Sequence, residues 1–470
     1  MNSEIEENFI LNSFIEGRNI LLHGPAGSGK TFQINKLKQF ILSQDNDLSS
    51  LAIMAPTGTA SFHIGGNTIH SEFGIGIFTL TPAIISHIEK YDDYLENPNN
   101  PELSDSVKYL AKYDEIIKNL VKKSRFNNTN LKYIFIDEIS MVGVTILRIM
   151  DGILRSRHGF NKNLPFGGVQ CVFSGDFYQL QPVKDNYCCF SKLWDSLNLV
   201  VVNMNNNRRF KNDDNYFSFI LRIRQGLLLQ SDKEFLESRF KAYENKDYKN
   251  QIVKPLKLYS RNNDVNEINV KKLERLDSDL FVYEAKDNVI IKMKGLSKSA
   301  HDSLQNKIRD RLDEISEIEL RIKVGAQIIF TRNYDISLGL TNGRMAKILE
   351  IKDNKHNPIV TIQTVDGLIF EIKKMEFKLE AHNYVATRNQ FPFKLGWAIT
   401  THKSQGMTLD TAIVEVNAFC AGGSYVAISR VNNKNNLYIS KLFLKKIYAD
   451  KKIIDKFNNQ KAEEFDIDCL

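Results

Sequence analysis

The segment NILLHGPAGSGKT, residues 19–31, determines what the first part of the chain is expected to form. Asn19–Leu22 is apolar and predicts a short buried strand, and Phe32–Leu42 has the pattern of a helix. The residues between them match G-x-x-x-x-G-K-S/T in full. Glycines allow backbone N–H groups to surround phosphate oxygens, and a helix N-terminus attracts negative charge. The segment therefore predicts a phosphate-binding loop.

Within this loop, Lys30 is expected to reach the β- and γ-phosphates of a nucleoside triphosphate, and the Thr31 hydroxyl is expected to bind Mg²⁺. A glycine-rich turn without a ligand is the alternative. The motif by itself indicates a nucleoside triphosphate and leaves the reaction open. The residues predicted to hold the nucleotide are Gly24, Pro25, Ala26, Gly27, Ser28, Gly29, Lys30 and Thr31.

Three more apolar strands are predicted downstream, at Leu51–Met54, Tyr133–Ile136 and Val169–Phe173. They alternate with helical segments, which is the pattern of an α/β fold with a doubly wound parallel sheet. Ligands gather at the carboxyl ends of the strands in such sheets. A polar and largely helical insertion is expected at residues 79–130, ahead of the third strand.

Polar residues follow two of these strands. Asp137 and Glu138 come directly after the third strand, and Gln179 follows the fourth within GDFYQ. We expect Asp137 to hold Mg²⁺, Glu138 to polarise the attacking water, and Gln179 to sense the γ-phosphate or that water. The alternatives are two acids that cap the next helix and a glutamine satisfied within a turn.

The second half of the chain shows a similar alternation, with strands predicted at LKLYS from Leu256, at Thr411–Val416 and at Leu437–Ser440. Between them, Ile359–Ile372 reads IVTIQTVDGLIFEI, a hairpin signal with Asp-Gly at its turn. Together with Gln327–Thr331 this hairpin predicts a small antiparallel barrel. The alternating charges of Asp302–Arg321 indicate a solvated helix face rather than a binding surface.

Composition excludes several classes of protein. The chain has 470 residues and a formal net charge of +7. This charge mildly favours an acidic partner such as nucleic acid. No apolar run approaches the roughly 20 residues that cross a bilayer, and the start MNSEIEENFI lacks the layout of a secretory signal. The cysteines form no zinc or disulfide pattern and predict reduced thiols; they are Cys171, Cys188, Cys189, Cys420 and Cys469.

Seven motifs in order resemble those of the Pif helicases, a branch of superfamily-one helicases related to the RecD subunit. In the first half they are HGPAGSGKT, APTGTASFHIGGNTIHSEFGIG, IDEISMV and PFGGVQCVFSGDFYQLQPV, of which PFGGVQ is the most specific to the family. In the second half they are FILRIRQG, LGWAITTHKSQGMTLD and SYVAISRV. They span Gly24 to Val431, nearly the whole chain.

The resemblance implies two RecA-like P-loop NTPase lobes with parallel sheets and a small inserted Src-homology-like β-barrel in the second lobe. The boundaries we predict are 1–200 for the first lobe, 201–254 for a helical connector, 255–323 and 393–470 for the second lobe, and 324–392 for the barrel. The resemblance also implies that Arg430 is the arginine finger that crosses to the γ-phosphate. It implies that Arg209 is a second catalytic arginine. The adjacent Arg208 leaves this alignment ambiguous by one residue.

A track for single-stranded DNA is expected on each lobe, because small hydroxyls, glycines and cations can approach phosphate oxygens closely. The predicted contacts are Thr57, Gly58, His70 and Ser71 in the first lobe, and Thr401, His402, Lys403 and Ser404 in the second. Alternatives remain open: His70 as a core histidine, Thr57 as a helix cap, and Phe177 and Tyr178 in the core rather than stacked on bases.

The chain departs from the family at the position where relatives carry a glutamine that reads adenine. That position is Glu7 or Asn8 here, which puts adenine preference in doubt. Phe210 replaces a usual glutamine after the predicted arginine, Gln181 stands where a proline is common, and Gly423 replaces another glutamine. None of these changes removes a catalytic group.

We therefore expect an ATP- and Mg²⁺-dependent helicase that moves 5′ to 3′ on single-stranded DNA and unwinds duplexes, in replication, recombination or repair. Its expected partners are single-stranded DNA and duplex junctions, with other replication or repair proteins as candidates and a monomer favoured. An intracellular location is expected, in the cytoplasm, nucleus or a viral replication site. The alternatives are a nucleotide-switched DNA-binding ATPase without unwinding and a small-molecule phosphotransferase.

Overall fold

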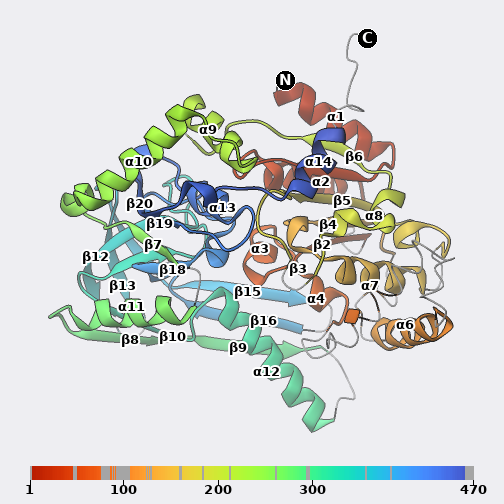
Figure 1. The fold of residues 1–470 in the computed structure, drawn as a ribbon. Helices are drawn as coiled ribbons and strands as arrows, with labels where there is room; N and C mark the ends of the chain where they lie inside the picture. Colours follow the sequence, from red (N-terminus) through yellow and green to blue (C-terminus); the bar gives the residue numbers. More distant parts are fainter. Residues whose placement is uncertain are drawn as a thin grey trace. The chain divides into compact units, whose positions relative to one another are not determined.

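The computed structural model describes two compact units, Met1–Arg208 and Arg209–Leu470, and we treat each by itself (Figure 1). The described residues are 3–45, 50–75, 85, 86, 88, 90, 106–122, 124, 126, 130–157, 161–182, 185–210, 213–259, 262–292, 297–354, 357–381 and 384–460. Most of the predicted insertion at 79–130 lies outside them.

Unit 1 is built on a six-stranded parallel sheet with strand order β3-β2-β4-β5-β1-β6. Its strands are β1 Ile20–His23, β2 Leu51–Ala55, β3 Asn67–Thr68, β4 Tyr133–Ile136, β5 Gln170–Gly175 and β6 Val200–Asn203. Its α-helices are α1 Ser3–Ile15, α2 Lys30–Asp45, α3 Gly58–His63, α4 Ile69–Glu72, α6 Ser106–Val121, α7 Val144–Arg155 and α8 Lys192–Ser196. Short 3-10 turns are η4 Ile139–Met141, η5 Pro165–Gly168 and η6 Cys188–Phe190.

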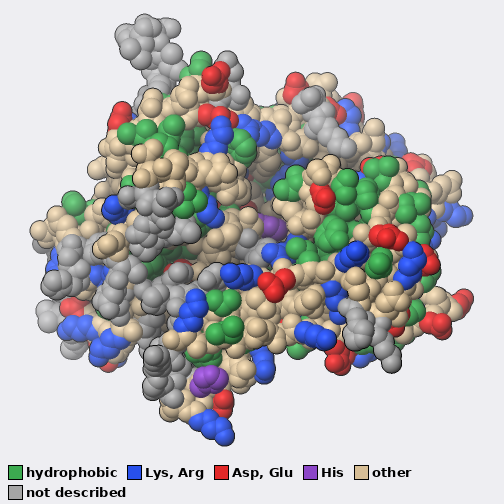
Figure 2. Space-filling view, turned by 180° about the vertical axis from the view of Figure 1, so that it is seen from behind, with side chains coloured by type: hydrophobic (Ala, Val, Ile, Leu, Met, Phe, Trp, Pro, Cys, Tyr) green, Lys and Arg blue, Asp and Glu red, His purple; other side chains and the backbone are tan. Residues whose placement is uncertain are grey.

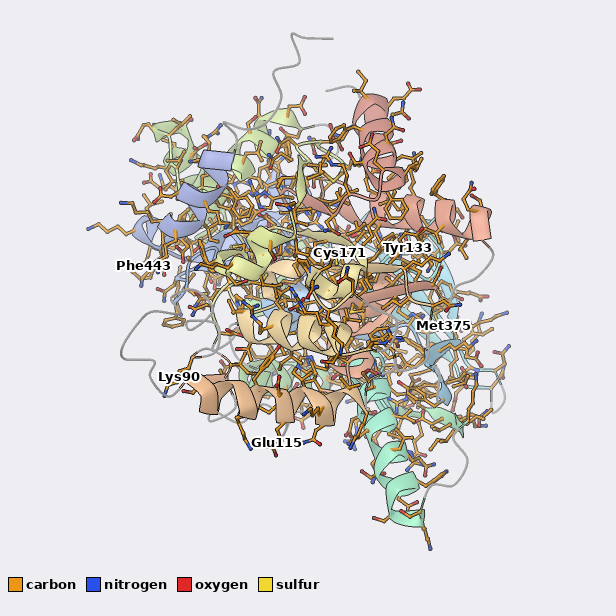
Figure 3. The ribbon with its side chains drawn as sticks, turned by 90° about the vertical axis from the view of Figure 1, so that its right-hand side faces the viewer. Lys90, Glu115, Tyr133, Cys171, Met375 and Phe443 are labelled. Atoms are coloured by element: carbon orange, nitrogen blue, oxygen red, sulfur yellow. The ribbon has the colours of Figure 1, made fainter. Side chains whose placement is uncertain are left out.

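The sheet is buried because its central strands are apolar along their length. Every residue of β1 is buried, and so are residues 134–136 of β4 and 171–175 of β5. Helices α1 and α2 contribute Phe14 and Ile34 to the core above β1. On α6, Ile116 and Ile117 are buried while Glu115 extends outward from the helix (Figure 3).

The four strands predicted in this unit are all present, each within two residues of its predicted bounds. The edge strand β6 was missed, because its four residues precede a run of asparagines that carries no strand pattern. Phe177 and Tyr178 are buried, and the Phe177 ring lies 5.5 Å from that of Trp194. Core packing, the second of the two alternatives for these rings, is therefore the one observed.

Unit 2 has a four-stranded parallel sheet with strand order β18-β7-β19-β20. These strands are β7 Leu256–Tyr259, β18 Ala398–Thr400, β19 Ala412–Val416 and β20 Leu437–Leu442, and the three predicted ones are among them. The helices of the unit are α9 Asp214–Arg224, α10 Gln230–Glu244, α11 Asn262–Glu274, α12 Lys298–Ile315, α13 Gly423–Ile428 and α14 Lys451–Gln460. Its 3-10 turns are η7 Asp247–Asn250, η8 His402–Ser404, η9 Lys434–Asn436 and η10 Leu444–Lys446.

The strands between β7 and β18 along the chain are all antiparallel. They form sheets of order β14-β13-β12-β11-β17, β15-β16-β9 and β10-β8. Their bounds are β8 Leu280–Glu284, β9 Lys286–Ile291, β10 Glu319–Lys323, β11 Gln327–Phe330, β12 Met345–Lys352, β13 Ile359–Thr364, β14 Ile369–Lys373, β15 Met375–Ala381, β16 Tyr384–Gln390 and β17 Phe393–Leu395.

The predicted hairpin is present as β13 and β14, with Gly367 at φ 85° in its turn. A glycine is favoured there because a side chain at positive φ clashes with its own backbone. Antiparallel pairing begins at Leu280, well before the predicted start at residue 324, because β8 pairs with β10. Closure of these sheets into a barrel and the domain boundaries remain predictions.

None of the described helices is long and apolar enough to span a bilayer. Cys171, Cys188 and Cys189 are buried free thiols, and Cys420 is a partly exposed one. Burial raises the pKa of the Cys188 thiol, which keeps it protonated and unreactive. Figure 3 shows Cys171 within the sheet of unit 1. On the face drawn in Figure 2, the described Lys and Arg side chains are scattered among acidic ones.

Gln327 joins the antiparallel part of unit 2 to its parallel sheet. Its Nε2 donates to the carbonyls of Lys254 and Gly396 at 2.8 and 2.7 Å, and its Oε1 accepts from the Lys254 N–H at 2.8 Å. Gln327→Leu removes all three bonds and leaves the buried Gly396 carbonyl without this partner, so we expect the free energy of unfolding to fall by about 2–4 kcal/mol.

The measurement is denaturant unfolding, with Gln363→Leu as the matched control. Gln363 makes one long hydrogen bond of 3.3 Å to the Gly367 carbonyl in the hairpin turn, so its loss is expected to cost less than about 1 kcal/mol. Equal losses in the two variants would contradict the bridging role of Gln327.

Candidate functional site

The loop between β1 and α2 lies close to the segment that follows β6, and this closeness restricts which residues it can contain. A Cβ on Gly24 would lie 2.2 Å from the Met204 carbonyl oxygen, so only glycine fits at this position. Gly27 and Gly29 have φ of 81° and 97°, conformations that disfavour side chains. Pro25, Ala26 and Ser28 complete the loop and are buried. The predicted phosphate-binding residues therefore share one tight turn ahead of the helix N-terminus.

Lys30 is placed inside this turn. Its ammonium donates to the carbonyls of Gly24 at 2.7 Å and Pro25 at 2.8 Å, and the side chain is buried. The charge is thus held over the loop, where it can transfer its hydrogen bonds to phosphate oxygens. Such bonds are stronger than those to carbonyls because both partners are charged.

Thr31 and Asp137 come from different elements and meet at the carboxyl edge of the sheet. The Thr31 hydroxyl donates to Asp137 Oδ2 at 3.1 Å, and the Ser174 hydroxyl donates to Asp137 Oδ1. The backbone N–H of Glu138 also donates to Oδ1, at 2.9 Å. A hydroxyl beside a carboxylate offers the hard oxygen ligands that Mg²⁺ prefers. Sequence reasoning missed Ser174, which lies within an apolar strand.

The Thr31 hydroxyl and the Asp137 carboxylate suit a metal ion that takes most of its ligands from water and phosphate. The described residues contain no group of three or more His, Cys, Asp and Glu side chains that could enclose a metal. Mg²⁺ is commonly held by only one or two carboxylates together with substrate phosphates. The two oxygen ligands at Thr31 and Asp137 therefore suit Mg²⁺ bound with a nucleotide.

Glu138 directly follows Asp137, and Gln179 follows β5, the strand paired with β4, in the same unit. Glu138 has φ 53° and ψ 42°, a left-handed conformation that is costly for a residue with a side chain. Gln179 is 3% exposed, and its Oε1 is buried without a hydrogen-bond partner among the residues that the structure describes. A buried unpaired amide oxygen is costly, which points to a ligand or water as its missing partner.

Arg208 is a neighbour of the phosphate loop that sequence reasoning left ambiguous. Its backbone N–H donates to the Gly27 carbonyl at 3.2 Å, and a Cβ on Gly29 would lie 2.9 Å from its Cδ. Its guanidinium lies 4.7 Å from the ring centre of Phe32 and 3.4 Å from a carboxylate oxygen of Glu7. The signal in the sequence was the pair of adjacent arginines in NNNRRF. Their spacing to other motifs did not show which of the two lies beside the loop.

Glu7 belongs to a small cluster beside this arginine. It also accepts a hydrogen bond from Lys36, which holds the pKa of the Glu7 carboxyl below its usual value. The Lys36 ammonium lies 5.1 Å from the Phe32 ring centre. Asn8, the other candidate for the family's adenine-reading position, is exposed on α1. Glu7 rather than Asn8 is therefore the residue directed at the loop region.

Arg209 and Arg430, predicted as catalytic arginines, converge on one serine of unit 2. Arg209 Nη1 donates to the Ser429 carbonyl at 3.2 Å, and Arg430 Nη2 donates to the Ser429 hydroxyl at 3.2 Å. Arg430 Nε donates to the Val426 carbonyl at 3.0 Å, and the side chain is 1% exposed. The structure therefore brings the two arginines together at the end of α13.

The predicted DNA contacts of unit 1 lie in or directly before two short helices. The Thr57 hydroxyl accepts from the Ala60 N–H at 3.2 Å, so Thr57 caps α3, and a DNA contact by the same residue remains a prediction. Gly58 is the first residue of α3, and His70 and Ser71 lie in α4. Burial lowers the pKa of His70, which keeps the imidazole neutral at physiological pH.

The predicted DNA contacts of unit 2 lie in η8, after β18. The Ser404 hydroxyl donates to the Thr401 carbonyl at 2.7 Å and is buried, so it shapes the turn instead of facing a strand of DNA. The Thr401 N–H donates to the Tyr259 carbonyl at 2.8 Å. Lys403 is exposed. The side chain of His402 lies outside the described part of the structure.

The parallel sheet of unit 1 with its phosphate-binding turn defines a P-loop nucleoside triphosphatase. A family model described as PIF1-like helicase matches residues 4–103 and 111–234, and one described as the 2B domain of DNA helicase Pif1 matches residues 311–351. The chain belongs to the Pif1-like helicase family.

Relatives of this family match the chain along nearly its whole length. The ATP-dependent DNA helicase Pif1 of Campylobacter jejuni is 30% identical over 93% of this chain and 90% of its own. The ATP-dependent DNA helicase PIF1 of Xenopus laevis is 27% identical over 97% of this chain, which spans 64% of that relative's length. A crystal structure of Pif1 helicase from Bacteroides in complex with ADP-AlF3 and single-stranded DNA has a TM-score of 0.56 at 23% identity, over 98% of this chain and 97% of that one. Two RecA-like lobes are thus the fold of this chain.

Ser174 is expected to position Asp137 for the metal. Ser174→Ala removes the hydrogen bond that orients the carboxylate, so we expect the Mg²⁺ concentration needed for half-maximal nucleotide binding to rise roughly tenfold. A fluorescent nucleotide titrated with Mg²⁺ measures this directly. Ser140→Ala is the control, because the Ser140 hydroxyl is buried in the same unit without a hydrogen-bond partner among the described residues. A tenfold change in both variants would point to a general loss of structure.

Proposed function

We propose that this protein is an ATP-dependent DNA helicase that moves 5′ to 3′ on single-stranded DNA and separates duplexes. The observation that carries the proposal is the phosphate-binding turn of Lys30 joined to the Thr31–Asp137 pair, in a chain of the Pif1-like family. These groups supply charge and oxygen ligands at one point, as phosphoryl transfer requires.

Each polar group of unit 1 has a defined part in this proposal. Lys30 and the loop N–H groups bind the β- and γ-phosphates, and Thr31 and Asp137 hold Mg²⁺, which neutralises charge on the phosphates. Glu138 orients and polarises the attacking water. The buried amide of Gln179 accepts a hydrogen bond from that water, or donates one to the γ-phosphate. Its unsatisfied Oε1 supports the first of these two roles.

Movement along DNA requires contacts that change with nucleotide state. We assign these contacts to Thr57, Gly58, His70 and Ser71 in the first lobe, and to Thr401, His402 and Lys403 in the second. His70 is neutral, so its imidazole contributes a hydrogen bond rather than a charge. Lys403 is exposed and supplies an electrostatic contact, which is expected to weaken with added salt.

The partners we propose are single-stranded DNA and duplex junctions, and the location is intracellular. A nucleotide-switched DNA-binding ATPase without unwinding shares the same site, so it remains the second candidate. The family match counts against a small-molecule phosphotransferase, because it extends over both halves of the chain.

Arg430→Ala tests the proposed arginine finger. Arginine fingers contribute roughly 10³ to 10⁵ in rate by stabilising charge in the transition state. We expect Arg430→Ala to bind a fluorescent ATP analogue as well as the wild type and to lose its DNA-stimulated ATPase activity by a factor in that range. Lys30→Met is the comparator, because it is expected to lose nucleotide binding itself. Near wild-type turnover in Arg430→Ala would remove the role assigned to this residue.

Strand separation on tailed duplexes tests the activity and its direction. We expect the protein with ATP and Mg²⁺ to separate a fluorescent duplex that carries a 5′ single-stranded tail, and to leave a 3′-tailed duplex intact. ATPase activity should rise when single-stranded DNA is added. Stimulation without separation of either substrate would favour the nucleotide-switched ATPase, and an ATPase rate indifferent to DNA would favour the phosphotransferase.

A further inference from the structure

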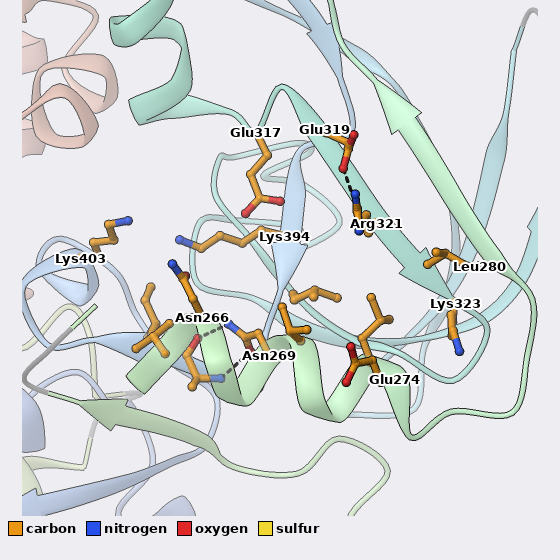
Figure 4. Close-up of a pocket in the computed structure, with 16 residues that line it drawn as sticks. Asn266, Asn269, Glu274, Leu280, Glu317, Glu319, Arg321, Lys323, Lys394 and Lys403 are labelled. Carbon is orange, nitrogen blue, oxygen red and sulfur yellow. Dashed lines mark hydrogen bonds and ion pairs between the residues drawn. The ribbon is translucent and has the colours of Figure 1, made fainter. Parts of the chain in front are cut away.

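Unit 2 contains a pocket of about 630 Å³ beside the turn that carries Lys403 (Figure 4). Its walls come from α11, from β8, from β10 and the segment leading into it, and from β17 and β18. The floor is apolar, with Val265, Leu273 and Ile399 among the lining residues. Pockets of 300–1,000 Å³ are typical of sites for small ligands or single chemical groups of larger ones.

Two lysines face one another at one end of this pocket. Figure 4 shows the ammonium of Lys394 directed towards Lys403, with Glu317 on one side and the amide of Asn266 on the other. None of the ion pairs or hydrogen bonds among the described residues involves the ammonium of Lys394 or Lys403.

Of the other charged groups of the pocket, Glu274 lies at the end away from the two lysines (Figure 4), and the cations Arg321 and Lys323 are engaged elsewhere. Arg321 Nε is paired with Glu319 at 2.6 Å, and the Lys323 ammonium donates to the Leu276 carbonyl at 2.7 Å. Lys394, Lys403 and Glu317 are then the charges that a ligand would meet at this end, a balance of one positive charge. Two unneutralised lysines that face the same space repel each other, and an anion between them removes that repulsion.

We propose that this pocket is a subsite for a backbone phosphate of single-stranded DNA, held between Lys394 and Lys403. The proposal rests on the DNA-binding function proposed above and adds Lys394 to it, a residue outside the motif that contains Lys403. A strand that reaches Lys403 on the exposed turn meets Lys394 next, because the two lysines line the same end of one pocket. A lysine binds phosphate as a point charge and needs no fixed geometry.

Proton uptake is a consequence of this arrangement. Burial and the neighbouring charge of Lys403 lower the pKa of Lys394 to about 8, and Glu317 acts in the opposite direction. A bound phosphate favours the charged ammonium and raises this pKa. The complex therefore binds more protons than the free protein, and DNA affinity falls as pH rises through about 8.

Two acids near the lysines also affect this balance. Burial raises the pKa of Glu317, and it raises that of Glu314, which interacts with Lys403. Since Glu317 faces the proposed phosphate, its negative charge opposes binding. Glu317→Gln should therefore bind DNA more tightly than the wild type and keep a fall in affinity with rising pH, moved to lower pH because Glu317 no longer raises the pKa of Lys394.

Anisotropy of a labelled oligothymidylate tests the proposal without ATP. For Lys394→Met we expect affinity to drop roughly tenfold, as for loss of a charge-assisted hydrogen bond. The slope of log K against log salt should become shallower by about 0.7, the value for one phosphate contact on a single strand. The fall in affinity through the pKa of Lys394 should disappear. Lys352→Met is the control, because Lys352 is exposed and paired with Glu371.

Three outcomes would overturn the inference. If the wild type binds the oligonucleotide and Lys394→Met has the same affinity, salt slope and pH profile, the subsite is wrong and the helicase proposal stands. If the wild type binds no DNA, both fall. If Lys394→Met loses binding of millimolar inorganic phosphate at constant ionic strength but keeps the wild-type DNA affinity, the pocket is a site for free phosphate instead of the strand.

Discussion

The carboxylate of Asp137 is the constraint on which the catalytic half of the molecule depends. It accepts hydrogen bonds from Thr31 at the start of α2 and from Ser174 in β5, and so ties three elements to one edge of the parallel sheet. The register of β4 against β5 aligns Ile136 with Phe173, which leaves Asp137 and Ser174 side by side. A buried carboxylate needs such donors because desolvation disfavours its charge. The same donors orient it for a cation, so the bonds that stabilise the fold also prepare the site.

In unit 2, a long antiparallel segment lies along the chain between β7 and β18, two neighbouring strands of the parallel sheet. Polar side chains help to join the two parts, together with apolar contacts of Leu273 and Trp397. Gln327 bonds to the backbone of Lys254 and Gly396, and Arg344 pairs with Asp410 at 2.8 Å. Such bonds have a defined geometry, in contrast to apolar contact, which tolerates sliding. The pocket with Lys394 lies along this junction, so the charges around it are held by the same rigid frame.

The sequence indicated the elements of this fold more reliably than the positions of its polar side chains. Apolar runs gave β1, β4 and β19 because burial on both faces leaves few residue choices. It missed β6, whose four residues precede a run of asparagines without a strand pattern, and Leu280–Glu284, where exposed and buried residues alternate irregularly. Motifs located Lys30, Asp137 and Gln179, since each follows the carboxyl end of an apolar strand. Ser174 and Lys394 had no such signal, and contacts between distant segments were needed to find them.

We propose that Glu7 stands at the position where relatives read adenine, so that its chemistry affects the choice of nucleobase. An amide can donate and accept at once, and so can match both the amino group and the ring nitrogen of adenine. Glu7 is a carboxylate whose pKa is lowered by its hydrogen bond to Lys36, so it accepts hydrogen bonds and donates none. Arg208 also approaches it, at 3.4 Å. One of the two hydrogen bonds that a glutamine would make to adenine is thereby lost at this position. We therefore propose that discrimination between triphosphates comes from other groups.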